Sequence, residues 1–384
     1  MTSVLDNYLP LISYLLVWAL LFVVGFVLKA EKHGIIVKPY YLMLKTVVFN
    51  SWMERLGGRF RRFWLTYFDI GAAIGIGLLI FVIYSFIKNA INLLYQTPQA
   101  GPTLLIIPLP GVTISWEIFP YILIAIAALL IPHEVAHGIA SVIDRVPIKS
   151  SGVFLAVFLP GGFVEIDEEN LAKRKAATKL RVFAAGSSTN VVSWFFVFIA
   201  LTSLFQPVPS GVLVTGLVSG GAAQNSLPQW SVITRINNST ITQARDLSAA
   251  LVKISPGTNV TVGLNNGQLV YITPKPAANN ASRAVLGISV ANYYATRLAF
   301  LSVPAAYQVL TALNWLSLIL LGVALVNMLP LFPFDGDRYF DTVLGLAKVK
   351  NTKYIRMVAS IVSLSLLLSN LILSYLRFGT IFPG

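Results

Sequence analysis

The chain has no cysteine among its 384 residues. This absence excludes disulfide bonds, thiolate metal ligands and cysteine nucleophiles together. Any metal site must therefore be built from histidine and carboxylate side chains. Histidine is scarce as well, with three in the whole chain, so the position of each one carries information.

Charged residues are also few. They make up 11% of the sequence, whereas hydrophobic residues make up 56% and the mean hydropathy is +0.75. This composition departs from that of soluble domains and indicates an integral membrane protein. The net charge of +13 would suggest nucleic acid in a soluble protein, but here Lys and Arg lie between apolar segments, where they set orientation. We expect the partner of this chain to be the lipid bilayer and not nucleic acid.

Long apolar segments account for most of the chain. A helix needs about 20 residues to cross the hydrocarbon core of a bilayer. The segments of this length are 9–28, 67–92, 118–143, 180–205, 305–329 and 354–376. The sequence therefore predicts a polytopic α-helical membrane protein with about six transmembrane helices.

Basic residues are concentrated in alternate connections between these segments. The first-to-second, third-to-fourth and fifth-to-sixth connections are rich in Lys and Arg, which marks them as cytoplasmic. The N-terminus and the long insert 206–292 are then extracytoplasmic. We expect a multi-pass protein of the cell membrane, with these parts outside. No pattern in the sequence indicates its oligomeric state.

The insert 206–292 differs from the rest of the chain in composition. It is rich in Gly, Asn, Ser and Thr, with short β-branched runs that alternate with turn residues and one helical stretch at 244–252. These features predict a small α+β domain between an N-terminal membrane part, 1–205, and a C-terminal one, 293–384. Residues 211–223, followed by 230–238, resemble the PDZ pattern associated with proteases, although Trp230-Ser231 stands where Gly-Asp is usual.

Two of the three histidines lie in the apolar segment 118–143, as His133-Glu134-Val135-Ala136-His137. Positions i and i+4 of a helix share a face, so both imidazoles can bind one metal ion. Glu134 emerges about 100° around the helix, which suits it to accept a proton from water rather than to bind the metal. The alternative is a metal-free polar patch, but ionisable groups at bilayer depth are costly and usually functional.

A third metal ligand must come from elsewhere in the chain. Four carboxylates, Glu165, Asp167, Glu168 and Glu169, follow the helix in sequence but lie in a polar, charged segment. Asp335 follows the fifth apolar segment, after Pro330 and Pro333, which break the helix and let the chain turn a carboxylate back toward the bundle. Asp335 is also a candidate N-cap for a helix at 336–347.

The motifs together resemble a known family. The His133-Glu134-x-x-His137 motif, paired with Asn327-x-x-Pro330-x-x-x-x-Asp335-Gly336 in a later segment, resembles the site-2 protease family of intramembrane zinc metalloproteases. The resemblance implies that His133, His137 and Asp335 bind Zn²⁺ and that Glu134 activates water.

Three further residues are candidates for contact with a substrate. Short apolar runs around Gly162 in segment 151–165 suit a re-entrant β-hairpin whose edge receives a substrate strand, or else a plain cytoplasmic hairpin or loop. Asn190 follows a run of small residues that is equally explained by close helix packing. Asn327 is suited either to contact with the substrate or to hydrogen bonds with the backbone groups left free where its helix breaks.

These observations favour a zinc-dependent intramembrane endopeptidase. We expect it to cleave single-span membrane proteins, such as membrane-held regulators or signal-peptide remnants, at a site toward the cytoplasmic side. The competing hypothesis is a non-proteolytic membrane scaffold or ion transporter that binds a metal. A transporter would be expected to carry more polar residues along several spans.

Overall fold

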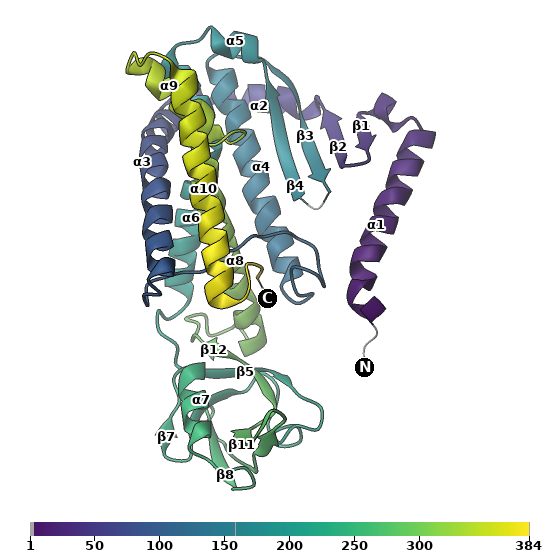
Figure 1. Cartoon of the computed structure of the whole chain (residues 1–384), viewed down its shortest axis with the longest axis vertical. Coiled ribbons are helices and arrows are strands. Elements are labelled where there is room, and N and C mark those ends of the chain that lie inside the picture. The colour runs from purple at the N-terminus through teal and green to yellow at the C-terminus, as the bar shows by residue number, and fades with distance from the viewer. Residues whose placement is uncertain (1–3, 158, 384) are drawn as a thin grey trace. The chain divides into compact units, whose positions relative to one another are not determined.

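A computed structural model describes residues 4–157 and 159–383 of the protein (Figure 1). The chain divides into two compact units, one made of the residues up to Phe196 and from Trp315 onward, the other of Val197–Asn314. The second unit includes the predicted insert 206–292. The predicted domain limits themselves remain a prediction.

Long apolar helices dominate the first unit. In the described part of the chain, five helices are long and apolar enough to cross a membrane: α3 (Arg61–Leu94), α4 (Phe119–Ile143), α6 (Ala176–Leu204), α8 (Val303–Asn327) and α10 (Thr352–Phe378). Each corresponds to a predicted span, because a helix satisfies its own backbone hydrogen bonds where no water is present. The first predicted span is also helical, as α1 (Val4–Val27), and among the fully described residues it contributes the apolar helical segment Leu11–Val27. A count of six spans therefore remains a prediction.

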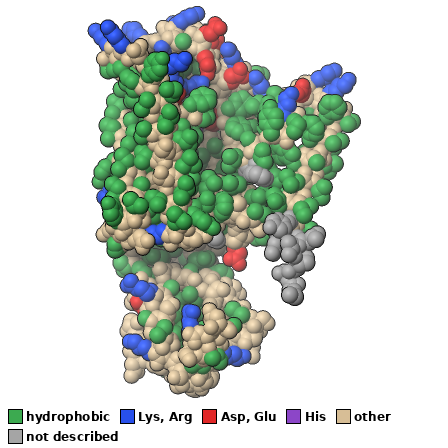
Figure 2. Space-filling view, in the orientation of Figure 1, with side chains coloured by type: hydrophobic (Ala, Val, Ile, Leu, Met, Phe, Trp, Pro, Cys, Tyr) green, Lys and Arg blue, Asp and Glu red, His purple; other side chains and the backbone are tan. Residues whose placement is uncertain are grey.

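Hydrophobic and basic side chains occupy different parts of the helical unit. Hydrophobic side chains cover the outward faces of α3 and α10, and Lys and Arg gather at the end where α5 (Glu168–Ala172) and α9 (Asp335–Leu346) lie (Figure 2). Ile80 and Val358, for example, are more than half exposed. This is the pattern of a protein embedded in lipid with one basic membrane face.

The helix that carries the two histidines lies in the interior of the unit. More of α4 and α6 is buried than of α3, α8 or α10. The short helix α2 (Val48–Arg59) packs its Met53 with Ile139 and Ile143 of α4 and Phe68 of α3 in one core cluster. This burial holds the second half of α4, where His133 and His137 lie, in one position.

An antiparallel sheet stands beside α4. Its order is β1 (Ile35–Lys38), β2 (Tyr41–Thr46), β3 (Ile148–Ala156) and β4 (Leu159–Ile166). The predicted hairpin is present as β3 and β4, which excludes a loop without strands. Its re-entrant position and its role in receiving a substrate strand stay predictions. The basic connection between the first two predicted spans also contains strands that were not predicted: two short apolar runs there pair as β1 and β2 and extend the sheet.

Helix α1 packs against β1, the edge strand of this sheet opposite to β4. It contacts β1 and the 3₁₀ helix η1 (Ala30–His33). Trp18 of α1 donates a hydrogen bond from Nε1 to the carbonyl oxygen of Pro39, at 2.8 Å. The turn between β1 and β2 is thereby tied to α1.

The second unit has an α+β fold. The strands are β5 (Gly211–Leu217), β6 (Val232–Ile236), β7 (Ser239–Thr240), β8 (Val260–Leu264), β9 (Leu269–Ile272), β10 (Lys275–Ala277), β11 (Asn280–Val285) and β12 (Ile288–Tyr293). The main sheet has the order β12-β5-β6-β8-β9, and α7 (Ala244–Val252) packs on its core, at the predicted position. Trp230 has a φ of 69°, a conformation that glycine adopts readily, at the position where the PDZ pattern has glycine.

Candidate metal centre

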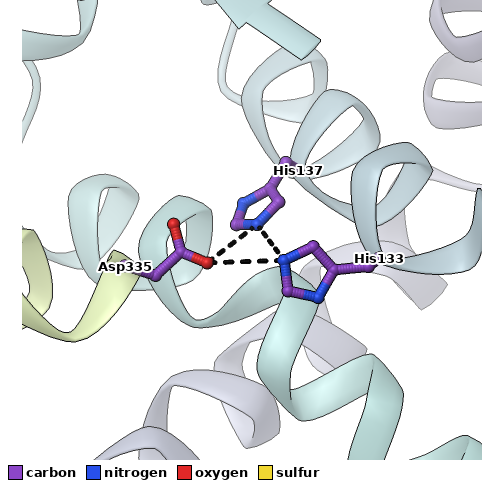
Figure 3. A group of neighbouring side chains, drawn as sticks. All are labelled: His133, His137 and Asp335. Atoms are coloured by element: carbon purple, nitrogen blue, oxygen red, sulfur yellow. Dashed lines mark hydrogen bonds and ion pairs between the residues drawn. The ribbon is translucent and has the colours of Figure 1, made fainter. Parts of the chain in front are cut away.

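Helix α4 presents His133 and His137 on one face, one turn apart. Both side chains are buried, and their Nε2 atoms lie 3.2 Å from each other (Figure 3). Residues four apart in a helix stack in this way, so the arrangement follows from the sequence spacing. The local helix thus brings two nitrogen donors to one point.

The carboxylate of Asp335 reaches the same point from α9. Its Oδ2 lies 3.1 Å from Nε2 of His137 and 3.5 Å from Nε2 of His133 (Figure 3). Asp335 is the first residue of α9, and the residue in the N-cap position is Phe334, with no side-chain cap. The alternative that Asp335 serves as the N-cap of this helix is therefore wrong.

The break between α8 and α9 turns Asp335 toward α4. Helix α8 ends at Asn327, and the chain passes Pro330 before α9 begins. Gly336 packs so tightly that a Cβ there would lie 2.3 Å from the carbonyl oxygen of Leu329. A residue without a side chain is required for the chain to fold back at this point.

The three donor atoms have the spacing of ligands around one tetrahedral ion. Bonds of 2.0–2.1 Å to zinc place tetrahedral ligands about 3.3 Å apart, and the observed separations run from 3.1 to 3.5 Å. Two imidazole nitrogens and one carboxylate oxygen are also the donor types of catalytic zinc sites. Within the described residues, His133, His137 and Asp335 form such a group, and they fit a zinc ion.

The other carboxylates considered from the sequence, Glu165, Asp167, Glu168 and Glu169, lie outside this group. Glu165 accepts hydrogen bonds from Lys45 Nζ at 2.7 Å and from Ser150 Oγ at 2.6 Å, and these bonds lower the pKa of its carboxyl group. Asp167 caps α5, where its Oδ1 accepts a hydrogen bond from a backbone N–H. Each of these two carboxylates already has partners of its own.

A cavity of about 600 Å³ opens onto the three donor atoms. Glu134 lines it beside His133, and β4 contributes residues 162–166. At Gly162 a Cβ would lie 2.7 Å from Cγ of Glu134, so only glycine lets the β4 backbone lie so near that side chain. Since β4 is the terminal strand of its sheet, its outer backbone edge is not paired with another described strand.

The two asparagines identified from the sequence both lie against His133, on different sides. Asn327 lines the cavity, and its Nδ2 is 3.3 Å from Nε2 of His133. Asn190 is fully buried, does not line the cavity, and has its Nδ2 3.0 Å from Nδ1 of the same imidazole. The structure therefore brings together all seven residues singled out from the sequence.

Two contacts from α6 were not predicted. The carbonyl oxygen of Val182 lies 2.7 Å from Nδ1 of His137. At Gly186 a Cβ would lie 2.4 Å from Nε2 of His133 and 2.5 Å from Nε2 of His137. Every residue has a backbone carbonyl, so the sequence cannot indicate which one contacts His137. Gly186, in contrast, belongs to the run of small residues before Asn190, which the sequence does show.

An ion-pair cluster holds α3, α4 and α6 together near these contacts. Arg181 of α6 donates from Nε to Asp69 of α3 at 2.6 Å and from Nη1 to Asp144, directly after α4, at 2.8 Å. Arg61 donates from Nε to the carbonyl oxygen of Ile143 at 3.0 Å. The helices that surround the two histidines are thus fixed at the basic end of the unit.

Comparison with known proteins identifies the family of this chain. Residues 121–369, which include the histidine motif and Asp335, match the model of peptidase family M50. An uncharacterized protein of Methanocaldococcus jannaschii is 26% identical over 92% of this chain and 90% of its own length. A membrane-bound transcription factor site-2 protease homolog of Arabidopsis thaliana is 28% identical over 40% of this chain and 29% of its own. The chain belongs to peptidase family M50, the site-2 protease family, and is a membrane metalloprotease of that type.

Proposed function

We propose that this protein is a zinc-dependent endopeptidase that hydrolyses peptide bonds within the membrane-spanning segments of other proteins. The observation that carries the proposal is the group His133, His137 and Asp335, whose donor atoms have tetrahedral spacing and face a cavity lined by Glu134. Membership in a peptidase family favours this function over a metal-binding scaffold or transporter.

The residues around the cavity have distinct roles in hydrolysis. His133, His137 and Asp335 would hold a zinc ion, which when bound would polarise the peptide carbonyl and lower the pKa of water to about 7. Glu134 accepts the proton of the attacking water and passes it to the leaving amine. Asn327 lines the same cavity and donates a hydrogen bond from Nδ2 to the substrate carbonyl.

The open edge of β4 is the proposed binding site for the substrate backbone. A peptide added as a further strand would be held extended beside Gly162 and Glu134, with main-chain hydrogen bonds along the strand. A transmembrane helix must unwind before its carbonyls reach the metal, because the helix uses them in its own hydrogen bonds. We propose single-span membrane proteins as substrates, including membrane-held regulators and signal-peptide remnants.

The basic end of the helical unit supports an orientation in the cell membrane. Lys and Arg near α5 and α9 favour a cytoplasmic position for that end under the positive-inside rule (Figure 2). The N-terminus and the PDZ-like domain are then extracytoplasmic. Asp335 begins α9, and this supports a metal centre nearer the cytoplasmic side.

Removal of the metal provides the test of this function. We expect purified protein to contain about one zinc ion per chain and to cleave a generic single-span substrate in detergent or liposomes. Dialysis against a chelator should abolish cleavage, and added zinc should restore it. Elemental analysis and gel-based cleavage measure both quantities. Protein that binds no zinc and cleaves nothing after zinc is added back would contradict the proposal.

Gly186→Ala is expected to disrupt the centre from α6. The added methyl group would lie within 2.5 Å of imidazole nitrogens of His133 and His137, so the rings must move. A displacement of about 1 Å at a catalytic site costs on the order of 10²-fold in rate, and we expect at least that loss together with less bound zinc. Gly322→Ala is the matched control, because a Cβ at Gly322 of α8 meets nothing within 4 Å. Equal cleavage by the two variants would contradict the described contact.

A further inference from the structure

Helix α6 touches both imidazoles through residues of one face. Val182, Gly186 and Asn190 are spaced by four and therefore lie along one side of the helix. The Val182 carbonyl lies at Nδ1 of His137, and the Asn190 amide lies at Nδ1 of His133. Gly186, between them, has no side chain to separate the helix from the rings. The ring nitrogens that face away from the donor cluster thus both face α6.

The contact with Val182 fixes the tautomer of His137. A carbonyl oxygen only accepts hydrogen bonds, so Nδ1 of His137, 2.7 Å away, must carry the proton. Nε2 is then the ring nitrogen left to supply a lone pair when a metal ion is bound, and it faces Asp335 and His133. This is the form in which an imidazole binds a metal through Nε2.

His133 needs the same arrangement, and within the described part of the chain the side chain at its Nδ1 is that of Asn190. To bind a metal through Nε2, His133 must carry its proton on Nδ1, and its partner there must be an acceptor. The amide nitrogen and oxygen of asparagine have nearly the same shape, so contacts decide their assignment. With Nδ2 toward His133, Oδ1 of Asn190 is buried and has no hydrogen-bond partner among the described residues. Turning the amide over places that oxygen against Nδ1–H.

We infer that Asn190 is a positioning residue, whose side-chain oxygen accepts a hydrogen bond from Nδ1–H of His133 and holds that imidazole with Nε2 toward Asp335 and His137. The inference rests on the proposed metal centre. Asn190 acts through His133 and does not touch the substrate, because it is fully buried and lies outside the cavity lining. The role differs from the substrate contact that the sequence suggested for Asn190.

Zinc affinity measured by competition with a chelator tests the inference first. Asn190→Leu removes the acceptor at similar volume, and we expect zinc binding to weaken by about 10- to 100-fold, as for other partners of metal-bound histidines. Asn190→Asp keeps an acceptor and is expected to bind zinc at least as tightly as the wild type. Ser187→Ala is the control, because Ser187 is buried on the same helix and its Oγ has no partner among the described residues.

The tautomer of His133 provides a second readout that needs neither zinc nor activity. With three histidines in the chain, ¹⁵N-labelled histidine gives few imidazole signals, and each is assigned by substitution. In metal-free protein we expect the Nδ1–H tautomer of His133 in the wild type and in Asn190→Asp, and its loss in Asn190→Leu. Asn190→Ala replaces the Leu variant if the latter does not fold.

The outcomes separate this inference from the proposed function. A Leu or Ala variant with wild-type zinc affinity and an unchanged His133 tautomer would overturn the role of Asn190. Wild-type protein that binds no zinc but shows the expected dependence of the tautomer on Asn190 would overturn the proposed function and leave the hydrogen bond standing. Lower affinity in the Leu variant with rescue by Asp would support both.

Discussion

Glu134→Gln should retain zinc and lose cleavage by about 10²–10⁴-fold, the usual contribution of a general base. Glutamine has the size of glutamate but cannot accept the proton of the attacking water. Zinc content should not change, because Glu134 is not among the three clustered donors. Cleavage of a purified single-span substrate and elemental analysis of the same sample measure the two effects.

Glu165→Gln is the matched control for this prediction. Glu165 lines the same cavity, but its carboxylate is bound to Lys45 and Ser150, and its loss should leave cleavage near the wild-type rate. If Glu165→Gln abolished cleavage while Glu134→Gln did not, the base would be misassigned. If both variants cleaved normally, proton transfer would depend on neither Glu134 nor Glu165.

Asp335→Ala should lose both zinc and activity. The substitution leaves two imidazoles as ligands. Removing a residue that only hydrogen-bonds to a metal ligand lowers metal affinity by up to about 100-fold, and we expect the loss of a ligand itself to lower zinc affinity by more than that. Chelator competition and zinc content per chain measure the loss, and a thermal unfolding transition shows that the chain is folded. Cleavage should fall to background because Glu134 has no activated water to deprotonate.

Asp341→Ala controls for damage to α9. Asp341 lies on the same helix, is partly exposed, and pairs with Arg356 at 3.2 Å, far enough along the helix to leave Asp335 in place. We expect its zinc content to match that of the wild type. An Asp335→Ala variant that bound zinc as tightly as the wild type would move the third ligand to another carboxylate.

Much of the fold was predictable because the membrane imposes a simple rule. Apolar segments of sufficient length form helices, and the five long helices α3, α4, α6, α8 and α10 correspond to predicted spans. The sheet was only half predicted. The runs that form β1 and β2 are short and lie among basic residues, and their pairing with β3 depends on a segment about 100 residues later in the chain.

The site shows the same division between local and long-range information. His133 and His137 share a face because a helix repeats every 3.6 residues, so the sequence by itself determined two ligands and the position of Glu134 beside them. Only the tertiary structure decided that Asp335, and not Glu165, completes the group. It also decided that α6 supplies partners for both imidazoles. Spacing along one helix is fixed by backbone geometry, whereas contacts between helices depend on packing and on backbone atoms common to every residue.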